Sequence, residues 1–284
     1  MDVSVIIVNY NTLDLTNDCI TSIVEHSCGI DYEIILVDNA SSDGSKDFFI
    51  KDNRIKYIYN EKNVGFGPAN NIGAHYAKGK YLFFLNSDTL LLNNALKLFF
   101  DYAEKHDHKT AYGGFLIKGD KSPACSSVEF PRTTFKEYLG SVFRRRKKRD
   151  HHNYGTLKSV DVIAGADIFV LKEDFDNVRG FDEHIFLYGE EVELQYRLKK
   201  HGIDRTLIPE PQIIHFTAES TKKTKNSYTR IKMNGHFVFL KKHTPWYFYY
   251  TARLYYGLRF LLMLPSSNNK KELVKTAFMS INLD

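Results

Sequence analysis

The sequence is poor in cysteine and tryptophan and has no long apolar run free of charge. It contains three cysteines in 284 residues, and no two of them form a Cys-x-x-Cys pair. An odd number of scattered cysteines argues against a disulfide framework and against a structural zinc site, and it fits a reducing compartment. The apolar run at residues 3–8 follows Met-Asp and is too short for a signal peptide. We therefore expect a cytoplasmic protein.

Two further absences exclude classes of function. The longest apolar region, residues 245–264, is interrupted by Arg253 and Arg259, which makes it a poor membrane-spanning helix. Neither a GxGxxG nor a GxxxxGK[ST] loop occurs, and this argues against a dehydrogenase and against a P-loop enzyme. No known nucleic-acid-binding motif accompanies the basic residues, so we expect no nucleic acid partner.

The composition is that of a globular protein with a sizeable core, since 43% of the residues are hydrophobic and 26% are charged. The net charge is +5, and the basic residues concentrate at 144–149 and 222–259. Such runs occur in solvated loops and at anionic surfaces alike. The charge alone therefore identifies no partner.

Strands and helices alternate over the first hundred residues. Short apolar runs bounded by polar turns predict buried strands, and longer segments between them predict helices. The predicted strands are 3–8, 33–37, 55–59 and 81–85, with helices at 15–25 and 69–77. This order predicts an α/β fold with a mostly parallel sheet and helices on both faces.

Polar clusters follow three of the predicted strands. They are Asn9-Tyr10, Asp38-Asn39 and Asn86-Ser87-Asp88. Ligands of parallel α/β sheets bind at the carboxyl ends of the strands, where these clusters fall. The sequence therefore predicts a ligand site at this edge.

Two of these polar residues suit a metal ion. Asp88 follows a buried strand, where it would hold a divalent cation against phosphate oxygens or would instead cap the next helix. His215 ends an apolar run and is interpreted first as a hydrogen-bonded histidine at a strand end. Alternatively, its neutral imidazole would share a cation with Asp88.

Three acids lie at the start of a predicted helix, residues 187–201, which Gly202 ends. Acids at this position also favour a helix through its dipole. Glu193 and Arg197 are four residues apart, which predicts an ordinary surface ion pair, and Glu190 shares their face. Glu191 instead aligns with two leucines on the inward face, where a general base would face a cleft.

Taken together, these segments resemble glycosyltransferase family 2, in its bacterial rhamnosyltransferase-like branch with a GT-A fold. The similarity is carried, in order, by residues 3–11, 37–45, 63–71, 85–88, 180–194 and 215–220. The first three are similar to the family's nucleotide-binding motifs. The fourth stands where the family has its DxD metal motif, the fifth is similar to its acceptor-side motif, and the last to its late histidine motif.

The resemblance implies a role for each strand-end residue in the donor site. Val8 and Tyr10 would line the base and ribose pocket, with Asp38 and Asn39 contacting base or ribose. Gly65 would let the backbone approach the nucleotide.

Further residues complete this implied site. Asn70 would lie close to the nucleotide, and Asn86 and Ser87 would border the nucleotide sugar. Asp88 would coordinate Mg2+ or Mn2+, with His215 as a further ligand. The Asn86-Ser87-Asp88 triplet departs from the family pattern because it keeps a single carboxylate.

On the acceptor side, Glu191 falls on the family's catalytic base, and Glu190 would hold the sugar or acceptor. The family usually has Asp at the base position, and Glu is one methylene longer, so the two residues could exchange roles. The implied enzyme is a metal-dependent inverting glycosyltransferase. It would use dTDP-rhamnose or a UDP-hexose and a hydroxyl of a polysaccharide or lipid-linked oligosaccharide precursor. A catalytically silent nucleotide-sugar-binding subunit and a sugar nucleotidyltransferase are the alternatives.

The predicted organisation is a catalytic domain at residues 1–221 and a helical extension at 222–284. The extension mixes tyrosines with lysines and arginines, as helices in a membrane interface do. It would lie on the cytoplasmic face of the inner membrane, pack on the catalytic domain, or form the contact of a homo-oligomer. These interpretations stay open at the level of sequence.

Overall fold

The computed structural model describes residues 1–106, 109–137, 156–216, 228–263 and 270–281. The chain divides into two compact units. The first comprises residues 1–130, 149–183 and 191–220, and the second comprises 131–148, 184–190 and 221–284. The basic run at 144–149 and the end of the last motif, 217–220, lie outside the described residues.

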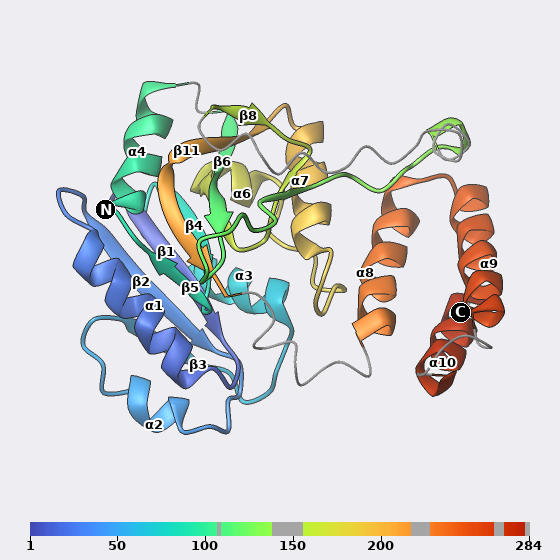
Figure 1. The fold of residues 1–284 in the computed structure, drawn as a ribbon, viewed down its shortest axis with the longest axis horizontal. Helices are drawn as coiled ribbons and strands as arrows, with labels where there is room; N and C mark the ends of the chain where they lie inside the picture. Colours follow the sequence, from blue (N-terminus) through green and yellow to red (C-terminus); the bar gives the residue numbers. More distant parts are fainter. Residues whose placement is uncertain (107–108, 138–155, 217–227, 264–269, 282–284) are drawn as a thin grey trace. The chain divides into compact units, whose positions relative to one another are not determined.

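A mixed sheet forms the centre of the first unit, with its strands in the order β3-β2-β1-β4-β10-β6-β11-β5 (Figure 1). Its first four strands are parallel neighbours: β3 (Lys56–Tyr59), β2 (Tyr32–Asp38), β1 (Val3–Asn9) and β4 (Tyr81–Asn86). The other half is mixed: β10 (Asp167–Leu171), β6 (Thr110–Ile117), β11 (Asp204–His215), β5 (Thr89–Leu91) and β8 (Lys158–Ser159), which pairs with β11. A separate small sheet joins β7 (Ser127–Val128) to β9 (Val162–Ile163).

Helices cover the sheet on both faces, as the sequence predicts. They are α1 (Leu13–His26), α2 (Ser45–Phe49), α3 (Phe66–Tyr76), α4 (Ala95–Lys105), α6 (Lys172–Asn177) and α7 (Glu190–Lys200). All seven residues of β1 are buried. Successive side chains of a strand point to opposite faces, so β1 supplies two cores. The mostly parallel α/β fold is thereby confirmed.

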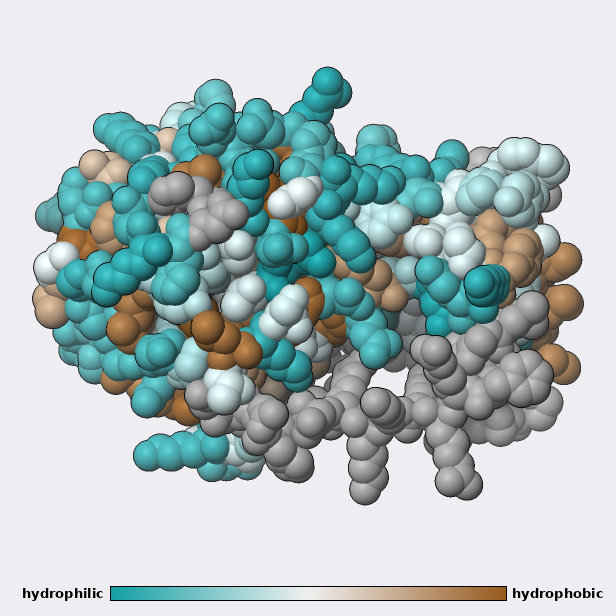
Figure 2. All heavy atoms as spheres, turned by 90° about the horizontal axis from the view of Figure 1, so that it is seen from above, coloured by the Kyte–Doolittle hydropathy of each residue, from teal (hydrophilic) through white to brown (hydrophobic). Residues whose placement is uncertain are grey.

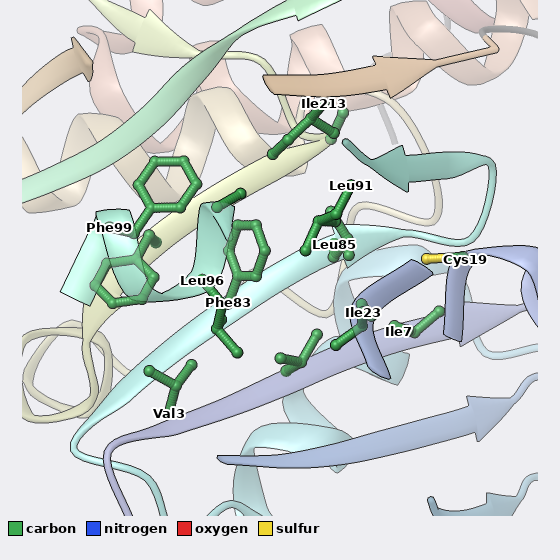
Figure 3. Packing of buried hydrophobic residues seen from close by; sticks show 14 of the residues in the cluster. Val3, Ile7, Cys19, Ile23, Phe83, Leu85, Leu91, Leu96, Phe99 and Ile213 are labelled. Carbon is green, nitrogen blue, oxygen red and sulfur yellow. The ribbon is translucent and has the colours of Figure 1, made fainter. Parts of the chain in front are cut away.

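The two cores use different helices. Val5 and Ile7 join a cluster with residues of α1 and α4, and Figure 3 shows Ile7 and Ile23 of this cluster on one side of the sheet. Ile6 and Val8 join a second cluster with α3, α6 and α7. Because both faces are apolar and covered, the polar residues of the unit are left to the ends of the strands.

The described part of the second unit includes the helices α8 (Tyr228–His243), α9 (Trp246–Leu262) and α10 (Lys270–Ile281). Arg253 of α9 is buried and donates hydrogen bonds to the carbonyl oxygens of Met279 and Ser280 at the end of α10. It also donates to the Tyr249 hydroxyl at 2.7 Å. Arg253 therefore ties α9 to α10. Among the described residues, no helix combines the length and apolar character needed to cross a membrane.

The turn after α6 depends on a glycine. Gly180 has a φ of +63°, and a Cβ built on it would lie 2.5 Å from Asn71 Oδ1. That oxygen accepts a hydrogen bond from the Phe181 N–H at 2.8 Å, and Asn71 Nδ2 donates to the Phe181 carbonyl at 2.8 Å. The turn is thus fixed to α3 by one side-chain amide. Gly202, after α7, also has a positive φ, +80°, as expected of a helix terminator.

We predict that Gly180→Ala destabilises the fold more than Gly202→Ala. Both substitutions force alanine into a left-handed conformation, which costs about 1–2 kcal/mol. A Cβ at Gly202 meets nothing within 4 Å, whereas one at Gly180 must displace Asn71. Urea unfolding of both variants measures the difference. Equal midpoints and slopes for the two variants would show that the Asn71 contact has no energetic weight.

Candidate active site at the carboxyl edge of the sheet

The ends of β1, β2 and β4 meet at one edge of the sheet. Asn9 is the register partner of Asp38, and Val8 is the partner of Asn86. The three polar clusters that follow these strands in sequence are therefore neighbours in space. This edge is the place where ligands of parallel α/β sheets bind.

Asn9 organises the first of the three loops. It is fully buried, and its Oδ1 accepts hydrogen bonds from the hydroxyls of Thr12 (2.8 Å) and Thr16 (3.0 Å). Its Nδ2 donates to Ser41 Oγ at 3.1 Å, which joins this loop to the one after β2. Tyr10, the next residue, is 44% exposed, so its ring is available to a ligand. Val8 faces inward and is buried.

Asp38 is buried and its carboxylate is engaged within the protein. Ser41 N–H donates to Oδ1 at 2.8 Å, and the Tyr57 hydroxyl donates to Oδ2 at 2.9 Å. Burial, and then this contact with Asp38, raises the pKa of Tyr57 far above its ordinary value, so the phenol stays a donor. A bond from Asp38 to base or ribose would compete with these contacts, and that role stays a prediction.

Asn39 connects the second loop to the third. Its Oδ1 accepts from Asn60 Nδ2 and from the Val64 N–H, each at 3.1 Å. Its Nδ2 donates to Asn63 Oδ1 (2.8 Å) and to the Gly65 carbonyl (3.1 Å). All four hydrogen-bonding positions of the amide are thus occupied. Asn39 shapes the loop, and a nucleotide contact from it stays a prediction.

The third loop ends at Gly65, which has a φ of +98° and leads into α3. A residue with a side chain rarely adopts this conformation, which explains the glycine. Asn70, on α3, is buried and donates to the Phe66 carbonyl at 3.0 Å. Gly65 is itself buried, so the approach of a nucleotide to its backbone stays a prediction. Asn70 stabilises the first turn of the helix.

Asp88 and His215 lie together, although they are far apart in the sequence. The ladder between β5 and β11 pairs His215 with Thr89, and the Phe216 N–H donates to the Asp88 carbonyl at 3.0 Å. His215 Nε2 lies 3.3 Å from Asp88 Oδ1. The structure therefore brings together the two residues that the sequence assigns to one cation.

Asn86 completes this cluster. Its Nδ2 lies 3.3 Å from the same His215 Nε2, and its buried Oδ1 has no hydrogen-bond partner among the residues that the structure describes. The tautomer of His215 decides which contact Nε2 makes: with a lone pair it accepts from Asn86 Nδ2, and with an N–H it donates to Asp88 Oδ1. With Nε2 unprotonated, this nitrogen and the Asp88 carboxylate are two electron donors that a shared cation would hold together. Asp88, His215 and Asn86 therefore fit Mg2+ or Mn2+.

The described residues contain no group of three or more His, Cys, Asp or Glu side chains that could hold a metal ion. Two such side chains leave most of a divalent cation's coordination positions to water or to a ligand. Ser87, between Asn86 and Asp88, is partly exposed and its hydroxyl lies 3.2 Å from that of Thr12. Ser87 is thus partly accessible beside the buried Asp88.

A buried cysteine lies next to this cluster but is not a nucleophile. Cys19 Sγ donates to the Asn86 carbonyl at 3.6 Å and lies 3.5 Å from Thr89 Oγ1. Burial raises the pKa of its thiol to about 12. The thiolate that nucleophilic catalysis requires is therefore absent at neutral pH.

The first turn of α7 approaches the same edge. A Cβ built on Gly165 would lie 3.3 Å from Glu191 Cβ, so this glycine allows a close contact with Glu191. The adjacent Ala166 carbonyl accepts a hydrogen bond from the Asn86 N–H at 3.0 Å. One loop therefore touches both Glu191 and the end of β4. Glu191 is partly exposed, whereas Glu190 and Glu193 are buried. The predicted inward position of Glu191 and surface position of Glu190 are therefore wrong, because helical spacing does not show which segments pack against each side of α7.

Gln195 fixes this contact and was not anticipated from the sequence. Its side chain is fully buried, and its Oε1 accepts from the Ile163 N–H at 2.7 Å. Its Nε2 donates to the Ile163 carbonyl at 2.8 Å. The pair holds α7 against the loop that Glu191 touches. The sequence feature that could have indicated this role is the position of Gln195, one helical turn after Glu191.

The predicted ion pair of Glu193 and Arg197 is present, but its predicted location on the surface is wrong. Glu193 is 0% exposed, and Arg197 donates to both of its carboxylate oxygens, at 2.6–3.0 Å. Arg197 also donates to the carbonyls of Val178 and Gly180. The turn at Gly180 packs against this side of α7, and its carbonyls need a buried donor. The buried pair therefore holds the turn at Gly180 against α7.

Asp167 is a further buried acid, and no role for it was predicted from the sequence. It begins β10 opposite Leu85, and its Oδ2 accepts a hydrogen bond from the Gly114 N–H at 2.6 Å. Within the described part of the chain, its Oδ1 has no hydrogen-bond partner. Burial raises the pKa of this carboxyl well above its ordinary value, partly opposed by the Gly114 bond. The neutral acid supplies an acceptor to β6, whose ladder with β10 is confined to the pair Phe169 and Tyr112.

Comparison with known proteins decides the family. The model of the family described as "Glycosyl transferase family 2" matches residues 4–165, more than half of the chain. The protein belongs to this family. The match covers the three nucleotide loops and Asp88, and it stops before Asp167, Glu191 and His215.

Curated relatives of this family 2 member include two rhamnosyltransferases. It is 24% identical over 257 residues to the N-acetylglucosaminyl-diphospho-decaprenol L-rhamnosyltransferase of Mycobacterium tuberculosis, covering 82% of this chain and 84% of that protein. It is 26% identical over 223 residues to rhamnosyltransferase WbbL of Escherichia coli K12, covering 74% and 83%. Its 29% identity to glycosyltransferase GlyG of Streptococcus pneumoniae extends over 117 residues, 40% of this chain and only 38% of that protein.

Solved structures show the same fold. GalNAc-T7, crystallised with UDP, GalNAc and Mn2+, superposes with a TM-score of 0.60 at 17% identity, covering 98% of this chain and 55% of that one. Staphylococcus aureus TarS 1-349 superposes with a TM-score of 0.53 at 15% identity, covering 85% and 73%. These neighbours are GT-A glycosyltransferases, so the family 2 member has the expected GT-A fold.

We predict that Asp167→Asn changes how stability depends on pH. The unfolded chain ionises Asp167 near pH 4, whereas the folded chain keeps it protonated to higher pH. The stability that wild-type Asp167 contributes is therefore complete below about pH 4 and is lost as the pH rises toward the raised pKa. Asparagine does not ionise and retains an acceptor for Gly114.

The free energy of unfolding of Asp167→Asn, minus that of the wild type, should therefore rise with pH by up to about 1.4 kcal/mol per unit. Urea unfolding between pH 4 and 8 measures this difference. Asp204→Asn, at an exposed acid of β11, is the control. A difference that stays constant across this range for Asp167→Asn contradicts the neutral buried acid.

Proposed function

We propose that this family 2 member is a metal-dependent, inverting glycosyltransferase that uses a nucleotide-diphosphate sugar donor. The observation that carries the proposal is the 3.3 Å approach of Asp88 to His215 at the carboxyl edge of the sheet. Glu191 supports it, because it contacts the loop that is hydrogen-bonded to the end of β4. The proposed donor site and the proposed base therefore both lie near the end of β4.

The donor half of the proposed site lies along the ends of β1, β2 and β4. The exposed Tyr10 ring and the backbone at Gly65 border the nucleotide, while Asp38 and Asn39 hold their loops in shape. Asp88 and His215 would hold Mg2+ or Mn2+, with Asn86 beside them. When bound, the cation offsets the negative charge that develops on the departing diphosphate.

Glu191 is the proposed base. Its carboxylate takes the proton from the acceptor hydroxyl while that oxygen bonds to the anomeric carbon and the bond to the diphosphate oxygen breaks. The attack from the face opposite the leaving group inverts the anomeric configuration. Partial exposure keeps Glu191 within reach of the acceptor, and the Gln195 pair with Ile163 holds its helix in place. The buried Glu190 is assigned a supporting role on the sugar or acceptor.

The relatives narrow the proposed substrates. Two named rhamnosyltransferases cover most of this chain, which favours dTDP-rhamnose over a UDP-hexose as the donor. The mycobacterial relative acts on a diphospho-decaprenol lipid, which favours a lipid-linked or polysaccharide precursor as the acceptor. We place the enzyme on the cytoplasmic face of the membrane, where such an acceptor would be met.

A catalytically silent nucleotide-sugar-binding subunit is the second candidate. The single carboxylate of the Asn86-Ser87-Asp88 triplet favours it, because one carboxylate holds a cation less firmly than two. A sugar nucleotidyltransferase has no comparable support in the sequence or the fold. A measurement of sugar transfer distinguishes the two candidates, because a silent subunit binds the donor without transferring the sugar.

We predict that isothermal titration with dTDP-rhamnose and UDP-hexoses detects one donor that binds in Mn2+ and not in chelator. Asp88→Ala should abolish this metal-dependent binding. Glu191→Gln should bind the donor as the wild type does and should lower kcat for transfer about 10²–10⁴-fold, since it removes only the base. Glu173→Gln, at an exposed acid in the first turn of α6, is the matched control.

Three results would contradict the proposal. Donor binding without turnover in the wild type, with every acceptor offered, would favour the silent subunit. Full turnover by Glu191→Gln would place the base elsewhere, with Glu190→Gln as the next variant. Absence of any donor binding by a folded wild type would remove the donor site itself.

A further inference from the structure

One side of α9 is covered by exposed apolar and aromatic side chains. Trp246 is 74% exposed and Leu262 is 81% exposed, and Leu254 and Leu258 are each about half exposed. The exposed set recurs at intervals of three or four residues, which defines a single helix face. This outer face consists of Trp246, Tyr247, Tyr250, Leu254, Leu258, Leu261 and Leu262. Figure 2 shows brown side chains gathered over the C-terminal helices.

The opposite side of α9 packs within its own unit. Phe248, Tyr249 and Phe260 are buried, and Arg253 caps the end of α10. Gly257 allows close packing, because a Cβ there would lie 2.4 Å from Ile281 Cγ1. The inner face therefore positions the helix. The outer face is an apolar surface that the described part of this chain leaves in contact with solvent, which is unusual for a soluble monomer.

The charge of this unit indicates what covers the outer face. Residues 228–281 contain nine lysines and arginines and a single acid, Glu272, which is buried. Lys241 and Lys242 are exposed just before α9, and Arg259 is exposed within it. In a symmetric contact between two copies, these like charges would face one another, at a cost in free energy. An anionic surface would attract them instead.

We propose that the outer face of α9 docks in the plane of a bilayer that contains anionic phospholipids. Leucines on this face enter the acyl boundary, while Trp246 and the tyrosines lie at headgroup level, where amphipathic rings are favoured. Lys241, Lys242 and Arg259 contact lipid phosphates. The helix lies on the membrane and does not cross it. This docking goes beyond the proposed transfer reaction and needs no donor or acceptor.

Vesicle sedimentation with the full chain tests the docking. Wild type should bind vesicles of phosphatidylcholine mixed with phosphatidylglycerol at least about tenfold more tightly than vesicles of phosphatidylcholine alone. Leu254→Glu/Leu258→Glu and, separately, Lys241→Gln/Lys242→Gln/Arg259→Gln should each weaken binding to the mixed vesicles by about tenfold or more. Ile50→Glu replaces an apolar residue of similar exposure in the first unit and should bind as the wild type does.

All substituted positions are exposed, and circular dichroism confirms that each variant is folded. Sedimentation velocity without vesicles gives the oligomeric state of the same samples. A wild type that dimerises, that is made monomeric by Leu254→Glu/Leu258→Glu and that ignores both kinds of vesicle would overturn the proposal in favour of a second copy. Equal binding of wild type and the leucine variant to the mixed vesicles would also overturn it. Titration with the donor is independent of these outcomes, so a failure here leaves the proposed transfer reaction standing.

Discussion

The short antiparallel ladder between β5 and β11 brings together the residues of the proposed cation site. Its three residue pairs place His215 opposite Thr89, and so bring an imidazole to 3.3 Å from the Asp88 carboxylate. Without that ladder, Asp88 would be a single acid at a strand end, and it could do no more than stabilise a helix start or a turn. With it, a carboxylate, an imidazole and the Asn86 amide converge. Such convergence is costly unless a proton or cation occupies the centre.

The remaining polar residues at this edge mainly form hydrogen bonds within the protein. Asn9, Asp38 and Asn39 are buried and hydrogen-bonded to neighbouring loops, which keeps three chain segments in fixed positions. Each such bond contributes only about 1 kcal/mol, but leaving a buried partner unsatisfied costs more, so the loops hold together as a network. The exposed ring of Tyr10 is the surface that these fixed loops present to a ligand.

The parallel strands and the gathering of their polar ends could be predicted from sequence, because both depend on local patterns of apolar and polar residues. The buried pair of Glu193 and Arg197 could not, because spacing along a helix does not reveal which turn packs on its outer side. Gln195 and Asp167 were missed for the same reason. Their roles depend on strands and loops far away in the chain. The aromatic and basic composition of α9 was visible, but only the structure separates its outer face from the inner face that Arg253 anchors.

The central claim is that Asp88 and His215 hold one cation that also holds the donor diphosphate. Pulsed electron paramagnetic resonance of Mn2+ with wild-type protein and the nucleotide diphosphate tests it directly. The account predicts coupling of the same ion to one imidazole nitrogen and to phosphorus, with the nitrogen coupling absent in His215→Gln. Phosphorus coupling without any nitrogen coupling in the wild type, or a spectrum identical to that of Mn2+ and nucleotide without protein, would contradict it.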